Sequence, residues 1–282
     1  MDVLVDGLAF PECPRWHDGA LWFSDQHDLK VLRADVSSGA VATICEVARQ
    51  PSGLGWLPDG DLLVVSMHDR RLLRLRDGSQ LVEHADLSGV ASFHCNDMVV
   101  DAVGRAYVGN FGFDFETRGT EFVAAAIALV DPDGTVRVAA DGLGFPNGSV
   151  ITPDGATFIV GESFGGGLTA FSIGEDGTLH DRREYARVEG AVPDGICLDA
   201  EGAVWFADPV GGDVIRVREG GEVTDRLVIG DGRKAYACML GGPERRTLFV
   251  CAASSHSAAK TAVARDGRIV AVDVDVPGAG LP

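Results

Sequence analysis

The most regular feature of the chain is a short apolar strand pattern that recurs and carries one polar residue near its start. A large apolar residue follows each polar residue by four positions, and a turn glycine follows by seven or eight. Equal offsets in a repeat place residues at equivalent points in space, so we expect these side chains to converge. The polar residues are Glu12, Ser52, Asn96, Asn147 and Asp194.

A second apolar stretch follows each turn glycine, such as ALWFSD at 20–25 and AVWFADP at 203–209. Successive turn glycines, at positions 19, 60, 104, 155 and 202, lie 41 to 51 residues apart. A period of this length, with several short strands in each unit, is typical of a β-propeller. A sixth, degenerate copy lies at 239–254. The pattern therefore predicts an all-β, six-bladed β-propeller of four-stranded antiparallel blades, forming a single domain over residues 1–282.

The two ends of the chain predict how the ring closes. The last copy has one clear strand after its second, at 267–276, and then lacks a fourth, whereas a spare strand stands at 2–8. We expect the N-terminal strand to pair beside the last one, because closure removes exposed sheet edges. A doubly wound α/β fold is the competing class, and it is disfavoured because no sustained helical periodicity is present.

Composition narrows the class of protein further. The formal net charge of −18 argues against nucleic acid and anionic membranes as partners. The N-terminus has no basic region followed by an apolar run, and no stretch is long enough for a transmembrane helix. The six cysteines contain no CxxC pair, and because the sequence shows no secretory signal we expect reduced thiols and a cytoplasmic location. They are Cys13, Cys45, Cys95, Cys197, Cys238 and Cys251. Cys13 and Cys95 flank the polar set, but no base is spaced to activate either thiol.

The loops after the second strands should form the rim on the side where the polar residues lie. The longest covers residues 111–122, with Phe111, Phe113 and Phe115. An exposed aromatic group of this kind indicates an apolar wall or lid over a pocket. A strand extension whose phenylalanines pack on the neighbouring blade explains the same residues, and both interpretations stay open.

The five polar residues together indicate a divalent cation. Taken singly, Asn147-Gly148 and Asp194-Gly195 read as turns, but turn signals already follow later in each unit. Glu12 and Asp194 facing one channel would repel each other unless a cation neutralised them. Oxygen ligands favour Ca²⁺, with Mg²⁺, Mn²⁺ or Zn²⁺ as alternatives, and zinc is less favoured because no histidine or thiolate pair has the usual spacing. A metal-free polar plug is the other interpretation.

Several stretches together resemble the regucalcin and gluconolactonase (senescence marker protein-like) family of six-bladed propellers: PECPRW, CNDMVVDAVGRAYVGNF, PNGSVITPDG, PDGICLDAEGAVWFAD and GGPERRTLFV. The likeness spans nearly the whole chain. It implies that Glu12, Asn147 and Asp194 bind a catalytic divalent metal, calcium or zinc, and that the protein hydrolyses a lactone. It also implies that Asn96 contacts the substrate, as in regucalcin-like members, or the metal, as in related phosphotriester-cleaving propellers.

The chain departs from the sugar-lactone members of that family at two positions. They carry a substrate-binding arginine where His94 stands here, and usually a glycine where Met98 stands. Both changes, with the phenylalanine-rich loop, indicate a less polar lactone or ester. A packing role for His94 is the alternative.

Three functions follow from these residues. The leading hypothesis is a metal-dependent lactonase in which Asp194 takes a proton from water and His94, Asn96, Phe111 and Phe113 bind the substrate. The second is a phosphotriester or aryl-ester hydrolase that uses the same site. The third is a non-catalytic ligand-binding propeller. The sequence leaves the oligomeric state open.

Overall fold

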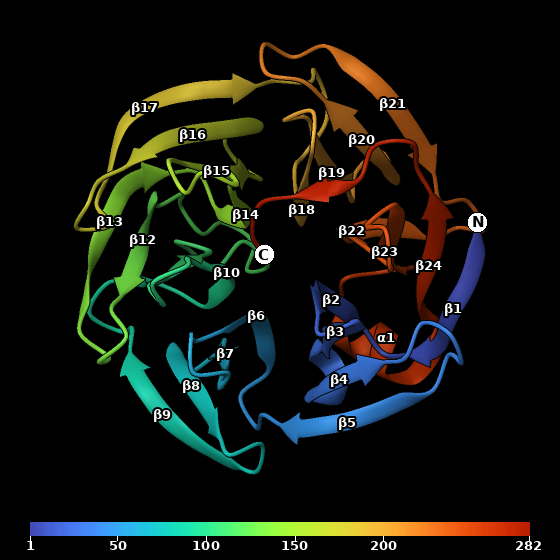
Figure 1. The fold of residues 1–282 in the computed structure, drawn as a ribbon, viewed down its shortest axis with the longest axis horizontal. Helices are drawn as coiled ribbons and strands as arrows, with labels where there is room; N and C mark the ends of the chain where they lie inside the picture. The colour runs from blue at the N-terminus through green and yellow to red at the C-terminus, as the bar shows by residue number, and fades with distance from the viewer.

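The computed structural model describes residues 1–282 as six antiparallel sheets arranged in a ring (Figure 1). In five blades the four main strands follow one another outward in chain order, as in β2-β3-β4-β5, whereas β1 is the outer strand of the last blade. The fold class is therefore confirmed as a six-bladed β-propeller.

The first three blades contain β2 (Pro11–His17), β3 (Ala20–Asp25), β4 (Lys30–Ala34) and β5 (Val41–Glu46); β6 (Pro51–Trp56), β7 (Leu62–Ser66), β8 (Arg71–Arg76) and β9 (Gln80–Asp86); and β10 (Cys95–Val100), β11 (Ala106–Asn110), β12 (Ala125–Val130) and β13 (Val136–Leu143). The other three contain β14 (Pro146–Ile151), β15 (Thr157–Glu162), β16 (Gly167–Ile173) and β17 (Leu179–Ala186); β18 (Ile196–Asp199), β19 (Val204–Asp208), β20 (Asp213–Val217) and β21 (Val223–Val228); and β22 (Lys234–Gly241), β23 (Thr247–Ala253) and β24 (Gly267–Asp273), completed by β1 (Asp2–Leu8).

The N-terminal strand closes the ring as the sequence predicts. β1 pairs antiparallel with β24, with Asp2 opposite Ala271 and Val5 opposite Ile269. The last blade thus combines the first strand of the chain with its last three long strands, and the two ends of the sequence hold each other in place.

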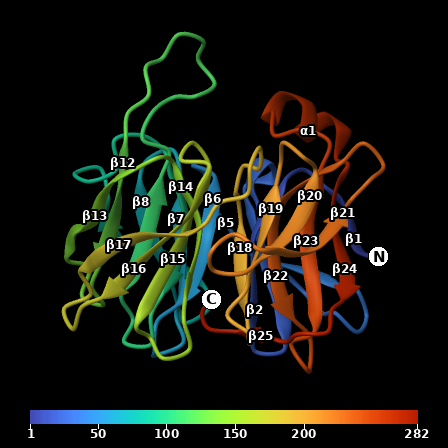
Figure 2. The same cartoon turned by 90° about the horizontal axis from the view of Figure 1, so that it is seen from above.

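Two short elements were not predicted from the sequence. Helix α1 (Ala258–Ala264) lies between β23 and β24 and is too short to give a helical periodicity over several turns. After β24 the chain runs back to add β25 (Gly278–Ala279) beside β18 as a fifth strand. Figure 2 shows α1 and the long loop before β12 on one face of the ring and β25 on the opposite face.

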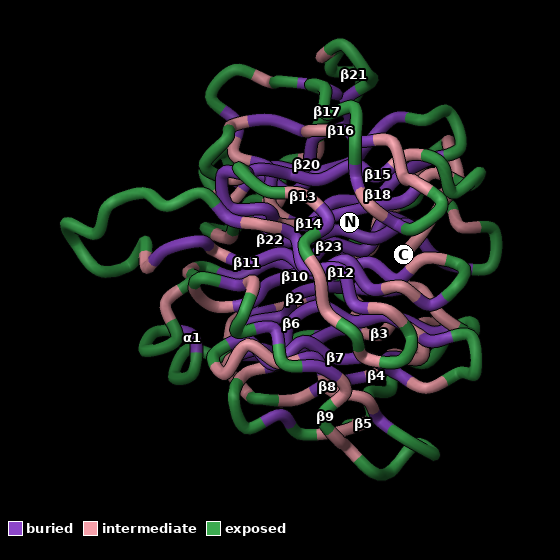
Figure 3. The backbone as a smooth tube through the Cα atoms, turned by 90° about the vertical axis from the view of Figure 1, so that its left-hand side faces the viewer, coloured by how far each residue is buried: buried purple, intermediate pink, exposed green.

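The hydrophobic core lies between neighbouring blades. Side chains of the second and third blades pack into one cluster that includes Leu63, Met98 and Val108, and equivalent clusters join the other blades. Inner strands such as β10 and β11 are buried along their whole length. Figure 3 shows the buried backbone in the middle of the molecule and the exposed backbone in the loops. No helix is long and apolar enough to cross a membrane.

Candidate functional site

A β-bulge re-aims the polar residue in most of the inner strands. The pairing register shifts between Glu12 and Arg15 in β2, and at the corresponding points of β6, β10 and β14. A bulge bends the strand and turns one side chain out of the regular alternation. Inner strand β22 has the same irregularity between Ala235 and Ala237, so Tyr236 occupies the sixth equivalent position. In five of the six blades the repeat identified in the sequence is therefore a repeat of bulges, whereas β18, which follows Asp194, pairs regularly.

The glycines after Asn147 and Asp194 serve close packing and not a turn. Gly148 lies within β14, and a Cβ atom there would collide with the backbone nitrogen of Ile196. Its N–H donates to the Asp194 carbonyl oxygen at 3.1 Å, and the Gly195 N–H donates to the Tyr236 carbonyl oxygen at 2.9 Å. These hydrogen bonds join the inner strands of adjacent blades, which fixes Asn147 and Asp194 relative to each other.

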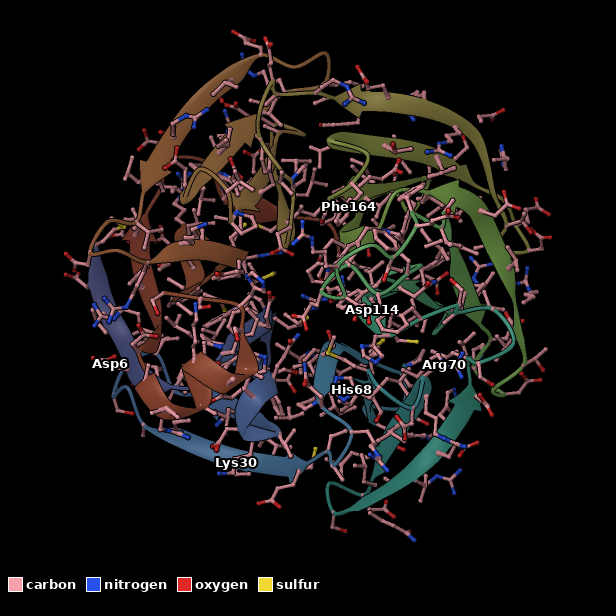
Figure 4. The ribbon with its side chains drawn as sticks, turned by 180° about the vertical axis from the view of Figure 1, so that it is seen from behind. Asp6, Lys30, His68, Arg70, Asp114 and Phe164 are labelled. Atoms are coloured by element: carbon pink, nitrogen blue, oxygen red, sulfur yellow. The ribbon has the colours of Figure 1, made fainter.

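A cavity of about 610 Å³ lies over the inner strands and brings most of the predicted residues together. Four polar residues from different blades line it, namely Glu12, Asn96, Asn147 and Asp194. His94, Phe111 and Phe115 line it as well. Figure 4 views this face, with His68, Asp114 and Phe164 around the centre and Asp6 and Lys30 near the rim.

The two carboxylates at this site are held in an unfavourable environment for negative charge. Burial raises the pKa of Glu12 to about 8, and the Asp97 charge adds to the effect. Burial also raises the pKa of Asp194 well above its usual range, followed by repulsion from Glu12 and Asp97, while a hydrogen bond from Asn147 lowers it. A cation between the carboxylates would offset the cost of ionising them in this buried environment. Two such carboxylates therefore favour binding of a divalent metal.

The amide side chains of the site also fit a ligand. Asn96 is 6% exposed, and its Nδ2 atom is buried without any hydrogen-bond partner. The Asn147 amide nitrogen donates to Ser163 Oγ at 3.2 Å, so its oxygen is free for another partner. Nowhere in the chain do three histidine, cysteine or carboxylate side chains converge on a possible metal position. The candidate set instead combines two carboxylates with amide oxygens, a chemistry suited to calcium.

A buried ion pair lies beside the carboxylates. The Arg15 guanidinium binds the Asp97 carboxylate and donates to the carbonyl oxygens of Leu54 and Met98 at 3.0 and 2.7 Å. One side chain thereby links the inner strands β2, β6 and β10. Because Arg15 follows Glu12 in β2 and Asp97 follows Asn96 in β10, the pair holds two of the candidate site residues in register.

Aromatic rings form one wall of the cavity. Phe111 stacks on Phe145 with centroids 4.3 Å apart, and Phe115 meets both rings edge to face. Phe164 packs against Phe145 at 5.4 Å and is half exposed. Phe113, predicted from sequence as a substrate contact, is buried and packs on Phe122 and Phe164, outside the cavity lining. Loop 111–122 therefore contributes both to the cavity wall and to packing behind it.

His94 stands where a packing role and a binding role meet. Its ring stacks on Phe93 with centroids 4.0 Å apart, and its centroid lies 4.3 Å from that of the His68 ring. The same ring also lines the cavity. Burial, with the nearby His68, lowers the pKa of His94 to about 4, so the ring is neutral near pH 7. None of the residues that line the cavity is an arginine.

Other residues of the cavity were missed or were given no role in the sequence analysis. Tyr236 and Phe145 face it together with His27, Gln26 and Lys234. The offset rule could have found Tyr236, because Leu240 follows it by four positions and Glu244 by eight. Ser52 belongs to the repeat but lies behind the lining, where it accepts a hydrogen bond from Gln26. All six cysteines are free, and burial raises the pKa of Cys95 to about 12, which opposes a reactive thiol.

The fold and this polar, oxygen-lined cavity define a six-bladed propeller with a candidate cation site on its axis. The chain belongs to the family described as SMP-30/Gluconolactonase/LRE-like region, which matches residues 10–254. The resemblance seen in the sequence is confirmed by this match.

Curated relatives cover nearly the whole chain. A 6-deoxy-6-sulfogluconolactonase of Pseudomonas putida is 27% identical over 280 residues, covering 96% of this chain and 93% of the relative. A pentonolactonase of Haloferax volcanii is 26% identical over 256 residues, covering 89% and 84%. The regucalcin of Gallus gallus is 27% identical over 258 residues, covering 88% and 85%.

Solved structures show the same fold. The calcium-binding protein regucalcin from Agrobacterium tumefaciens superposes with a TM-score of 0.80 at 22% identity, covering 99% of this chain and 95% of that one. A gluconolactonase from Xanthomonas campestris gives 0.73 at 24% identity, covering 99% and 89%.

Proposed function

We propose that this protein is a metal-dependent hydrolase that opens a lactone in the cavity over its inner strands. The observation that carries the proposal is the convergence of Glu12, Asp194, Asn147 and Asn96 from four blades on one cavity. Relatives named lactonases match the chain over most of its length, which supports lactone hydrolysis.

We infer that Glu12, Asn147 and Asp194 hold one divalent cation, with Asn96 beside it. Charge balance supports this. The carboxylates of Glu12, Asp97 and Asp194 carry three negative charges when ionised, and the Arg15 guanidinium offsets one, which leaves two. Oxygen donors favour Ca²⁺, and the regucalcin from Agrobacterium tumefaciens is described as a calcium-binding protein. When bound, the cation would neutralise the carboxylates and polarise the lactone carbonyl.

The chain's own residues supply the remaining chemistry. Asp194 is partly exposed to the cavity and takes a proton from the attacking water. The unpartnered Nδ2 atom of Asn96 donates a hydrogen bond to a substrate oxygen. The hydrogen bond from Asn147 to Ser163 keeps the amide oxygen of Asn147 turned to the cation position. This assigns Asn96 the substrate contact, one of the two roles that the resemblance left open, at a position beside the cation.

The aromatic wall supports an apolar substituent on the lactone. Phe111, Phe115, Phe145 and Phe164 present ring faces and edges on one side of the cavity. A polyhydroxylated sugar lactone would lose hydrogen bonds to water there without replacement. We also propose a cytoplasmic location, which six cysteines without any disulfide between them support.

The test is hydrolysis by protein that is first stripped with a chelator and then reloaded with Ca²⁺, Mg²⁺, Mn²⁺ or Zn²⁺. A phenyl-substituted γ-lactone, gluconolactone and an aryl phosphotriester are compared side by side. We expect metal-dependent opening of both lactones, with the phenyl lactone preferred. Turnover of the phosphotriester alone would assign the second class of hydrolase. Binding without any hydrolysis would assign a ligand-binding propeller.

A further inference from the structure

Helix α1 places a threonine against a cavity histidine. His27 follows β3 in a short 3-10 turn, Gln26–Asp28, and lines the cavity. Its Nδ1 atom lies 2.6 Å from the hydroxyl oxygen of Thr261, which is fully buried in α1. The same hydroxyl oxygen of Thr261 also lies 3.2 Å from the Ser257 carbonyl oxygen, so the hydroxyl has two partners.

These two contacts determine the tautomer of His27. A carbonyl oxygen only accepts, so the Thr261 hydroxyl donates its one proton to Ser257. The Thr261 oxygen is then an acceptor, and His27 Nδ1 must carry a proton to complete the contact. In the neutral ring Nε2 is consequently unprotonated. The opposite neutral tautomer would lose one of the two hydrogen bonds.

The surroundings keep the ring in this state. His27 stacks on Phe10 with centroids 4.6 Å apart, and Phe10 packs edge to face on Tyr236. Burial lowers the pKa of His27 to about 4, and the positive charges that His256 and His68 can carry act in the same direction. Arg265, directly after α1, bonds Asp28 at 3.1 and 3.4 Å, which fastens the helix to the turn that carries His27.

The remaining nitrogen has no partner in the protein. Nδ1 makes the one hydrogen bond of the ring, and Nε2 is not enclosed, so it is the acceptor that His27 offers to the cavity. The neighbouring Gln26 amide is already engaged by Ser52 and Gln50. The phenylalanines of the aromatic wall line the same cavity.

We propose that His27 is a substrate-binding residue whose Nε2 atom accepts a hydrogen bond from an O–H or N–H group of the substrate. The preferred substrate is then a lactone that carries such a donor together with an apolar group for the aromatic wall. The choice of a lactone rests on the proposed function, whereas the acceptor role of His27 does not. Thr261 is a positioning residue, since it acts through the ring.

The test uses two phenyl-substituted γ-lactones that differ in one group, a free hydroxyl in one and its methyl ether in the other. The wild type should favour the hydroxyl compound. His27→Phe keeps the stack on Phe10 but removes the acceptor, so kcat/KM for the hydroxyl compound should fall about tenfold, the effect of one hydrogen bond. The value for the ether should change little. His180→Phe, at an exposed histidine of outer strand β17, is the matched control.

Thr261 gives a second, independent arm. Thr261→Val removes the hydroxyl and frees Nε2 to carry the proton, so the preference for the hydroxyl compound should weaken, and Thr261→Ser should restore it. A purely structural role of Thr261 would lower the melting temperature without changing the ratio of the two kcat/KM values.

Binding is measured by calorimetry with two non-hydrolysable analogues, in which the lactone ring of each compound is replaced by a cyclic ether. Suppose that neither lactone is hydrolysed, but the cyclic ether with the free hydroxyl binds more tightly than the one with the methoxy group, and His27→Phe abolishes this difference. The proposed function is then wrong and the role of His27 stands. The role of His27 is wrong if the wild type shows no preference for the hydroxyl compound in turnover or binding, or if His27→Phe lowers both compounds equally.

Discussion

At the scale of single residues, the site depends on two carboxylates that cost stability unless they are neutralised. In the proposed site, replacing Asp194 by Asn or Glu12 by Gln would remove one of the two negatively charged metal ligands, and Asp194→Asn would remove the proposed proton acceptor as well. We expect both variants to lose hydrolysis by more than about a hundredfold, within the range of a lost general base. The same change relieves buried repulsion, so the metal-free variants should melt at or above the wild type. Full activity of metal-loaded Asp194→Asn would contradict the assignment.

His27 predicts a dependence of stability on pH. Its folded pKa, lowered to about 4, lies below the ordinary value of 6.5. Between these values the unfolded chain binds more protons than the folded one, so stability is retained above pH 6.5 and lost as the pH falls toward 4. His27→Phe removes this contribution. Denaturant unfolding at pH 7 and pH 4.5 should therefore show a smaller loss in the variant than in the wild type, and an equal loss would contradict the assignment of a buried neutral ring.

At the scale of elements, the repeat could be predicted from the sequence because turn glycines and apolar strands recur at regular spacing. The closing pair β1 and β24 followed from counting strands. The bulges did not, since they change register without changing composition, and loop 111–122 gave no signal to separate Phe111, in the cavity wall, from Phe113, behind it. Helix α1 was not predicted because its seven residues are too few to show a helical periodicity, and the contact between Thr261 and His27 was missed with it. Long-range contacts between loops of different blades leave no local pattern.

Contact between inner strands predicts the effect of a methyl group at Gly148. Its Cβ would collide with the Ile196 nitrogen and come 2.8 Å from the Gly195 Cα, both of them backbone atoms that cannot move aside. Gly148→Ala should destabilise the protein by about 1–3 kcal/mol, as overpacking does, and weaken metal binding by separating Asn147 from Asp194. Gly89→Ala, where nothing lies within 4 Å, is the control. An unchanged melting temperature and calcium affinity in Gly148→Ala would show that close packing of adjacent inner strands does not determine the positions of Asn147 and Asp194.

The link made by Arg15 gives a second prediction at this scale. Arg15→Met leaves Asp97 as an unpaired charge among inner strands, and breaking a buried pair costs about 3–5 kcal/mol. Asp97→Asn in the same chain should recover part of this loss, which a double-mutant cycle measures. Arg183→Met, whose side chain and partner Glu219 are both exposed, should cost less than about 1 kcal/mol. Equal effects at Arg15 and Arg183 would show that the Arg15–Asp97 pair does not join the inner strands.

At the scale of the whole molecule, the ring makes the two ends of the chain part of one cooperative structure. β1 supplies the outer strand of the last blade, and the Ala9 and Phe10 N–H groups that follow it donate to Asp25 at 3.0 and 2.7 Å. Removing residues 1–9 exposes the edge of β24 and uncovers Phe249 and Ile269, which pack in one cluster with Val5 and Leu8.

The truncated chain should therefore unfold at a clearly lower temperature and bind calcium more weakly, because Glu12 lies only three positions after the deleted segment. Removing residues 277–282 is the matched control. It deletes β25, which pairs with two residues of β18, together with the bridge from Leu281 to Ile151, and it leaves the closing strand in place. We expect a smaller loss of melting temperature from this second truncation. Equal melting temperatures of the full-length protein and the chain lacking 1–9 would rule out closure by β1. A larger loss from the C-terminal deletion would show that the pairing of β25 with β18 stabilises the ring more than β1 does.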